Sequence, residues 1–399
     1  MLFSSKKLEA IKPSATISIS SKTRELIESG KDIINLAMGE PDFNTPNHII
    51  EAAKSALDMG ETRYTAVNGS VELRNAICKK FKRDNQLNYN IEQIHVSGGG
   101  KPVIFNALMA TLNVGDEVII PAPYWVSYPD ITLLFDAVPV IVECPESAGY
   151  KIAPEQLESS ITSKTRWLIL NSPSNPTGAA YTKDELKALA AVLLKHPNIL
   201  IFSDDIYEHL IYDDVEFVTM AQVEPKLWDR TLTMNGMSKA YCMTGWRLGY
   251  AGGPTELIKA MTKVQSQSIS HACSISQAAT VAALNGSHEF MYMNNHEYKM
   301  RRDLVVDMLN EAIGLSCEVP AGAFYAYPNC KMLIGKQTTS GKVIHNDEDF
   351  VLYLLEHGVA TVHGAAFGMS PHFRVSYAAS LSDLERACKR IQNACRLLV

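Results

Sequence analysis

NGMSKAYCMTGWRLGYAGG, residues 235–253, is the segment around which this chain is organised. Short strands are predicted before it at Thr231–Met234 and at its end at Arg247–Ala251, so a tight, glycine-flanked return carries both Lys239 and Arg247. A lysine becomes a nucleophile when burial or a fixed cation removes its proton, whereas an arginine keeps its charge and binds anions. The pair suits a ligand with an aldehyde and a phosphate, although a surface turn with two solvated cations has the same spacing.

The composition describes a globular chain of enzyme size. Its 399 residues exceed what one hydrophobic core usually organises, so two domains are expected. The net charge of -6 argues against general affinity for nucleic acid or acidic membranes but permits a local basic pocket. Neither a signal-peptide segment nor an apolar run of about 18 residues is apparent, so we expect a cytoplasmic protein.

The eight cysteines show no Cys-x-x-Cys spacing, so neither a zinc site nor a redox motif is predicted. We expect reduced, buried thiols. An apolar stripe at helical spacing supports this expectation, and it contains Leu384, Cys388, Ile391, Cys395 and Leu398.

Strands alternate with helices through the first two thirds of the chain, as is typical of an α/β fold. Strands are predicted at 117–120, 138–142, 167–171 and 199–202, and helices at Pro154 and at the capping box Thr182-x-x-Glu185. This order favours a largely parallel sheet with helices on both faces. Ligands then bind where strands end, and the segments PYW (123–125), NSPSNPTG (171–178) and DDIY (204–207) lie at such ends, as does Lys239.

A glycine-rich loop, SGGGKP (97–102), follows a predicted strand at Ile94–Val96 and precedes an apolar helical run. Glycines let backbone amides approach an anion, and the helix start adds its positive dipole end. The loop is not a Walker motif, because Pro102 stands where Ser or Thr is required, and not a dinucleotide fingerprint, because Val103 replaces the third glycine. A plain tight turn and an anion site remain open.

The ends of the chain predict a second domain. Thr45 is expected to cap a helix, a further helix follows Gly69-Ser70, and the last helix is expected to start at Ser382-x-x-Glu385. A charged helical stretch at 288–310 leads into short strands near 323–327, 359–362 and 373–376. We expect an arm at 1–15, a large domain at 48–285, and a small domain that combines 16–47 with 286–399.

Taken together and in order, SGGGK, YW, NSPSNPTG, DDIY, SK with MTGWRLGY, and FRVSY resemble the class I aminotransferases of the aspartate aminotransferase family. Such proteins are pyridoxal 5'-phosphate enzymes of fold type I, with a mostly parallel seven-stranded sheet and a smaller α+β domain. The opening LEAIKPSATISI and the lysine that ends the glycine loop look closest to the bacterial subgroup of aspartate and prephenate aminotransferases.

The resemblance implies a role for each cofactor-binding residue. Lys239 would bond to the cofactor aldehyde and then move the substrate proton, and Asp204 would pair with the pyridine nitrogen. Tyr207 and Asn175 would hydrogen-bond the ring oxygen, and Trp125 would stack on the ring, although a buried core aromatic is an equally good interpretation of Trp125. The phosphate would be held by Arg247, by the loop residues Gly99, Gly100 and Lys101, and by Tyr64 of a second subunit, which implies a homodimer.

The same resemblance implies how substrate is bound. Arg374 would bind the α-carboxylate with help from Gly39, Asn175 and Trp125, although an arginine in a strand could also form a rim ion pair. Lys101, with Thr16 nearby, would bind a distal carboxylate, which favours ping-pong transamination between aspartate and 2-oxoglutarate. Prephenate remains an alternative substrate, which Lys12 and Thr16 would bind. A β-lyase or decarboxylase remains an alternative activity, because such an enzyme would keep the same cofactor residues.

Three departures from the family pattern accompany these expectations. Gly236 stands where the family often has serine, Asp205 replaces the usual glutamate, and no distal arginine can be matched between Asn285 and Arg301. A ligand-sensing domain of a transcription regulator would need a helix-turn-helix ahead of it, for which about 15 residues are too few. The family also suggests cis peptide bonds before Pro123 and Pro176.

Overall fold

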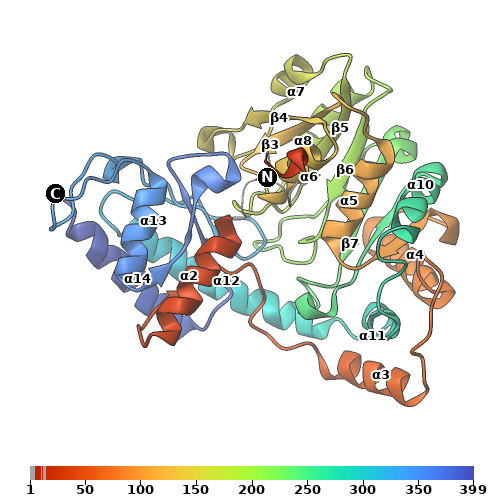
Figure 1. Cartoon of the computed structure of the whole chain (residues 1–399), viewed down its shortest axis with the longest axis horizontal. Coiled ribbons are helices and arrows are strands. Elements are labelled where there is room, and N and C mark those ends of the chain that lie inside the picture. The colour runs from red at the N-terminus through yellow and green to blue at the C-terminus, as the bar shows by residue number, and fades with distance from the viewer. Residues whose placement is uncertain (1–4, 10, 12–14) are drawn as a thin grey trace.

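The computed structural model describes residues 5–9, 11 and 15–399. Figure 1 shows a larger lobe built around a sheet and a smaller lobe that contains α13 (Asp347–Glu356) and α14 (Leu381–Arg396). The long helix α12 (Glu289–Asn310) runs from the larger lobe into the smaller one (Figure 1).

A seven-stranded sheet organises the larger lobe, in the order β2-β8-β7-β6-β5-β3-β4. All neighbouring strands are parallel except the pairs that β8 makes with β2 and with β7. The strands are β2 (Ile94–Ser97), β3 (Glu117–Ala122), β4 (Val138–Glu143), β5 (Thr165–Asn171), β6 (Leu200–Asp204), β7 (Thr231–Gly236) and β8 (Gly249–Gly252). The predicted mostly parallel α/β sheet is confirmed.

Helices cover both faces because alternate strand residues point to opposite sides. In β3, Val118 and Ile120 join the core under α5 (Gly100–Thr111), α6 (Ser127–Leu134) and α10 (Thr255–Ser266). Ile119 faces the other way, toward α7 (Pro154–Ser160), α8 (Lys183–Leu193) and α9 (Met220–Val223). A third core lies among α3 (Asn47–Asp58), α4 (Val71–Asn85) and α11 (Ser274–Asn285). The capping box predicted for α8 is present.

Two predicted helix starts are wrong. Thr45 does not cap α3, because its hydroxyl donates to the backbone carbonyl of Cys242 at 2.6 Å and the following proline takes the cap position. The last helix is capped by Ser380, whose hydroxyl accepts the backbone N–H of Asp383, and not by Ser382. At the last helix a neighbouring serine caps the helix start, whereas α3 follows Pro46 without a side-chain cap, and spacing alone reveals neither outcome.

The smaller lobe has its own core. Strands β11 (Val362–His363), β12 (Phe373–Ser376) and β9 (Tyr325–Ala326) form an antiparallel sheet, and β1 (Ile34–Asn35) pairs in parallel with β10 (Val359–Ala360). They pack with α2 (Ala15–Glu28), α12, α13 and α14. The predicted apolar stripe of α14 is confirmed, since all five of its residues are buried here. The short helix α1 (Lys6–Glu9) lies apart from this core, and Lys7 pairs with Asp136 at 2.5 Å.

Three smaller expectations have mixed outcomes. All eight cysteines are free, but only five are buried, because Cys78 and Cys242 are partly buried and Cys273 is exposed. The peptide bonds before Pro123 and Pro176 are cis as predicted. Within the described ranges, none of the helices is both long and apolar enough to cross a bilayer.

Candidate active site

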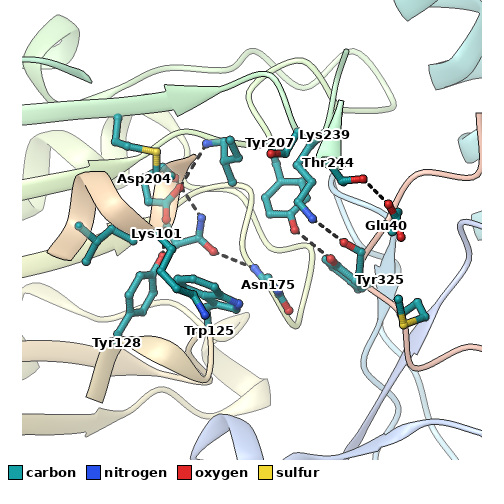
Figure 2. Close-up of a pocket in the computed structure, with 18 of the residues that line it drawn as sticks. Glu40, Lys101, Trp125, Tyr128, Asn175, Asp204, Tyr207, Lys239, Thr244 and Tyr325 are labelled. Carbon is teal, nitrogen blue, oxygen red and sulfur yellow. Dashed lines mark hydrogen bonds between the residues drawn. The ribbon is translucent and has the colours of Figure 1, made fainter. Parts of the chain in front are cut away.

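A cavity of about 360 Å³ lies where the carboxyl ends of the central strands meet the smaller lobe. Figure 2 shows its lining side chains converging from both lobes. Ten of the sequence-predicted residues line it: Gly39, Gly100, Lys101, Trp125, Asn175, Asp204, Tyr207, Lys239, Arg247 and Arg374. Segments that lie more than 300 residues apart in the chain therefore form one site.

The other predicted residues lie outside the cavity lining. Gly99 sits directly behind it, against the guanidinium of Arg247. Tyr64 is 92% exposed and does not line the cavity. The backbone of Thr16 belongs to α2, but its side chain and the whole of Lys12 fall outside the described residues.

The N-terminus of α5 meets Arg247 and the start of β8 in a close cluster of Gly99, Gly100, Arg247 and Gly249, here called the anion cradle. Gly99 has φ +116°, and a Cβ there would lie 2.5 Å from Arg247 Nη2. A Cβ at Gly249 would lie 2.4 Å from the backbone of Gly99, so both glycines are needed for the close approach. The first amides of a helix have no intrahelical partner, and the start of α5 lies next to this guanidinium. The anion-site interpretation of the loop fits this geometry better than a plain turn.

Lys239 lies in the centre of the cavity. Its Nζ donates to the backbone carbonyl of Gly39 at 2.5 Å and lies 5.7 Å from the ring centre of Tyr207. Burial, followed by the nearby charge of Arg374, lowers the pKa of Lys239 to about 8. A lysine with such a pKa is unprotonated often enough near neutral pH to attack a carbonyl carbon.

Asp204 ends β6 and is buried at the floor of the site. Tyr128, which the sequence interpretation missed, donates its hydroxyl hydrogen to Asp204 Oδ2 at 2.5 Å. Burial raises the pKa of Asp204 to about 6, while this hydrogen bond and the backbone N–H of Ile206 oppose the rise. A buried carboxylate with so few donors favours a cationic N–H partner.

Arg374 lies in β12 and points into the cavity from the smaller lobe. Its Nη1 donates to Asn175 Oδ1 at 2.9 Å and its Nη2 donates to the carbonyl of Ala37 at 2.6 Å. Arg374 is 2% exposed, pairs with no carboxylate of the described part of the chain, and has a buried Nε without a hydrogen-bond partner. The alternative prediction, that Arg374 forms an ion pair at the rim, is therefore wrong, and its guanidinium remains available for an anion.

Several lining residues were not predicted as site residues, although one of them, Thr244, lies inside the quoted segment MTGWRLGY. Tyr325, in β9, shares a hydroxyl–hydroxyl hydrogen bond of 2.8 Å with Tyr207, and Thr244 donates to Glu40 at the cavity mouth (Figure 2). Tyr128 follows the predicted PYW segment by one helical turn, a position that could have indicated it. Tyr325 gave no local signal because it reaches the site through the smaller sheet.

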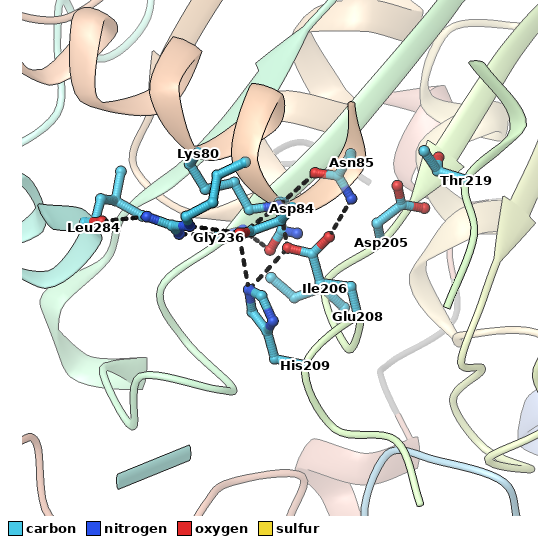
Figure 3. Close-up of polar contacts among 12 residues, drawn as sticks. Lys80, Asp84, Asn85, Asp205, Ile206, Glu208, His209, Thr219, Gly236 and Leu284 are labelled. Carbon is cyan, nitrogen blue, oxygen red and sulfur yellow. Dashed lines mark hydrogen bonds and ion pairs between the residues drawn. The ribbon is translucent and has the colours of Figure 1, made fainter. Parts of the chain in front are cut away.

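A buried polar cluster supports the segment that carries Asp204 and Tyr207 from behind (Figure 3). Lys80 of α4 is fully buried and pairs with Glu208, which also accepts a hydrogen bond from Asn85 at 2.7 Å. Because Glu208 follows Tyr207 directly, this pair attaches the active-site segment to α4. Glu208, Asp84 and His209 lie close enough for a metal, but the ammonium of Lys80 already contacts the two carboxylates.

The fold and the site define a pyridoxal phosphate-dependent transaminase. Residues 31–391 match the family described as aminotransferase class I and II, and the chain belongs to that family, whose members depend on pyridoxal phosphate. Arg301, which ends the segment without a matching distal arginine, pairs with Asp42 at 2.8 Å and does not line the cavity.

Named relatives narrow the class further. The chain is 57% identical over 99% of both lengths to an aspartate/prephenate aminotransferase of Cereibacter sphaeroides. It is 52% identical to an aspartate aminotransferase of Rhizobium meliloti, over 98% of this chain and 95% of that one. A crystal structure of the Rhizobium meliloti aspartate aminotransferase matches with TM-score 0.97 and 51% identity over 99% of both chains. The Thermus thermophilus aspartate aminotransferase with maleate matches with TM-score 0.93 and 41% identity, over 99% of this chain and 100% of that one.

Proposed function

We propose that this aminotransferase transfers the amino group of aspartate to 2-oxoglutarate by a ping-pong mechanism. The observation that carries the proposal is the presence of two cations, the buried Arg374 and the more exposed Lys101, in one cavity with Lys239. Two fixed cations favour a substrate with two carboxylates, because a neutral side chain would leave one of them unpaired. The names of the relatives support the same substrate class, as does the Thermus thermophilus structure with maleate, which is itself a dicarboxylate.

The residues present fit pyridoxal phosphate. The anion cradle offers a guanidinium and helix amides to the phosphate, with Ser238 also on the cavity wall in place of the hydroxyl missing at Gly236. Asp204 would pair with the pyridine N–H, since its burial favours a cationic partner. Trp125 would cover one face of the ring. When bound, the cofactor supplies an aldehyde for the amino group and a ring that accepts electrons from the substrate α-carbon.

Lys239 has two tasks in this proposal. Its unprotonated Nζ would hold the cofactor through its aldehyde, and once substrate has freed it, the same nitrogen would carry the proton that leaves the α-carbon. A pKa of about 8 suits both tasks, because the amine can accept and return a proton near neutral pH. Tyr207 and Asn175 would hydrogen-bond the ring oxygen and hold the ring in place beside Lys239.

Substrate orientation follows from the two cations. Arg374 would bind the α-carboxylate bidentately, and Asn175, already its partner at 2.9 Å, would share that contact with the Gly39 backbone. Lys101 would bind the distal carboxylate. Its ammonium lies 4.9 Å from the ring centre of Trp125, and burial together with Arg247 lowers its pKa. A partly desolvated ammonium gains more from a carboxylate than a solvated one does.

We further propose a homodimer with shared active sites, in which Tyr64 of one subunit reaches the phosphate of the other. The exposed position of Tyr64, away from its own cavity, is compatible with this role. Sedimentation of the wild type should give a dimer, and Tyr64→Phe should weaken cofactor binding without changing that mass. The proposed domain boundaries, 48–285 for the large domain and 16–47 with 286–399 for the small one, stay as predicted.

A survey of amino donors with 2-oxoglutarate, and of oxo acids with aspartate, tests the proposed substrates. Aspartate should give the highest kcat/KM, with oxo acid as product and no released ammonia, sulfide or carbon dioxide. Release of those products would support a lyase or decarboxylase instead. Prephenate is the second candidate, because relatives above 50% identity carry it in their names, among them those of Cereibacter sphaeroides and Rhizobium leguminosarum. A kcat/KM for prephenate equal to that for oxaloacetate would support a dual role.

A further inference from the structure

The hydroxyls of Tyr207 and Tyr325 form an isolated pair at the junction of the two lobes. They lie 2.8 Å apart, and both side chains are buried. In the described part of the chain, neither hydroxyl has another hydrogen-bond partner. Each hydroxyl carries one hydrogen, and the hydrogen bond between them uses only one of the two. The other hydrogen, here called the spare hydrogen, is free to bond to a third group. Which tyrosine keeps the spare hydrogen decides what the pair can do.

The surroundings of Tyr325 make it the better donor. The guanidinium of Arg374 lies 4.6 Å from the ring centre of Tyr325. Burial raises the pKa of both phenols and Arg374 opposes the rise in both, but Arg374 is the leading influence after burial only for Tyr325, whereas Tyr325 outweighs it for Tyr207. The more acidic phenol donates the stronger hydrogen bond. With Tyr325 as the donor to Tyr207, the spare hydrogen belongs to Tyr207.

Tyr325 is also held firmly. It pairs with Ser376 in the small antiparallel sheet, whose strand β12 carries Arg374. Its hydroxyl packs against Gly39, where a Cβ would lie 2.7 Å away. Figure 2 shows the tyrosine pair beside the end of Lys239. The hydroxyl of Tyr325 therefore keeps a fixed position relative to the substrate-binding arginine.

We propose that Tyr325 is a positioning residue, which donates its hydroxyl hydrogen to Tyr207 and so directs the Tyr207 hydrogen toward the ring oxygen of the cofactor. The proposal rests on the proposed function of this site. A donor that itself accepts a hydrogen bond is strengthened. Tyr325 thereby helps Tyr207 to stabilise negative charge on the ring oxygen and favours the unprotonated form of the nitrogen that Lys239 shares with the cofactor.

Other charged and titratable groups act on that nitrogen and must stay constant in a test. Asp204 of β6, Arg374 of β12, Glu40 after β1 and Arg247 before β8 all influence Lys239. Replacing Tyr325 by phenylalanine removes one neutral hydroxyl and leaves these four charges in place. A matched control is Tyr327→Phe, which removes a buried hydroxyl two residues further on that donates to the carbonyl of Met369 at 3.0 Å.

The test is a pH titration of the visible absorbance of the holoenzyme, which reports the proton on the nitrogen of Lys239. Tyr325→Phe should raise the titration midpoint by about 0.5 unit, and Tyr207→Phe should raise it by more, roughly 1 unit. Tyr327→Phe should titrate as the wild type does. Because Tyr325 acts through Tyr207, adding Tyr325→Phe to Tyr207→Phe should change nothing further.

Each contrary outcome has a distinct meaning. A lowered midpoint in Tyr325→Phe would show that Tyr207 donates to Tyr325, which overturns the proposal. Additive shifts in the double variant, or the same shift in Tyr327→Phe, would also overturn it. Absence of any titration in the wild type supplied with cofactor would instead contradict the proposed function, so the two failures can be distinguished.

Discussion

Replacing Lys101 by methionine should separate dicarboxylic from monocarboxylic amino donors. The substitution removes the ammonium but keeps an unbranched stem beside Trp125, whose ring centre lies 4.9 Å from Nζ. A hydrogen bond to a charged group contributes about 1.5 to 3 kcal/mol. Burial and Arg247 lower the pKa of Lys101, but the residue as a whole is exposed, so solvent screens its charge and the lower part of that range applies. A loss of about 1.5 to 2 kcal/mol converts to roughly a 10- to 30-fold fall in kcat/KM for aspartate.

The assay compares kcat/KM for aspartate and for alanine at saturating 2-oxoglutarate and saturating pyridoxal phosphate. Alanine has no distal carboxylate, so its kcat/KM should change by less than about threefold. Lys151→Met is a suitable control, because Lys151 is paired with Glu185 at 2.5 Å in the larger lobe. This substitution should leave kcat/KM unchanged for both donors. Equal losses for aspartate and alanine would refute the assignment of Lys101 to the distal carboxylate.

Three other substitutions test buried groups and the cradle. Glu208→Gln leaves the charge of Lys80 buried without its main partner, so the free energy of unfolding in urea should fall by about 3 to 5 kcal/mol; a fall below about 1 kcal/mol would contradict this. Asp204→Asn should stabilise the apoprotein by about 3 kcal/mol at pH 7. In the wild type, the Asp204 carboxyl keeps its proton up to about pH 6 when the protein is folded, whereas the unfolded chain releases it near pH 3.8. The cost of burying the wild-type carboxylate therefore grows as pH rises between these two values. The two proteins should be equally stable below about pH 3, and equal stability at pH 7 would count against a buried, unpaired carboxylate. Gly249→Ala forces a Cβ to 2.4 Å from the cradle backbone and should weaken pyridoxal phosphate binding more than about tenfold in a cofactor titration, whereas Gly245→Ala, which has open space around it, should bind normally.

Local patterns predicted the elements of the fold well, because their physical causes are local. The alternation of Val118, Ile119 and Ile120 between two cores is a property of the strand itself, and the capping box of α8 lies within four residues. Helix starts failed where two neighbouring residues could serve, as at Ser380 and Ser382. Position along the chain does not decide between such alternatives, whereas the packing of the helix does.

The site was predictable where residues belong to contiguous motifs and was missed where packing brings residues together. Lys239, Asp204 and Arg374 lie in recognisable segments, and the cavity contains all three. Tyr325 lies in a short strand without any polar pattern around it, and only the pairing of β9 with β12 places its hydroxyl beside Tyr207. A contact between residues 118 positions apart leaves no signal in a single sequence.

The most direct test concerns the nitrogen of Lys239. The purified protein, saturated with pyridoxal phosphate, is reduced with borohydride, digested and analysed by mass spectrometry. The cofactor mass should be found on the peptide that contains Lys239, and a Lys239→Ala variant that still folds should carry no such mass and show no turnover. Attachment at another lysine, or full activity of that variant, would contradict the account.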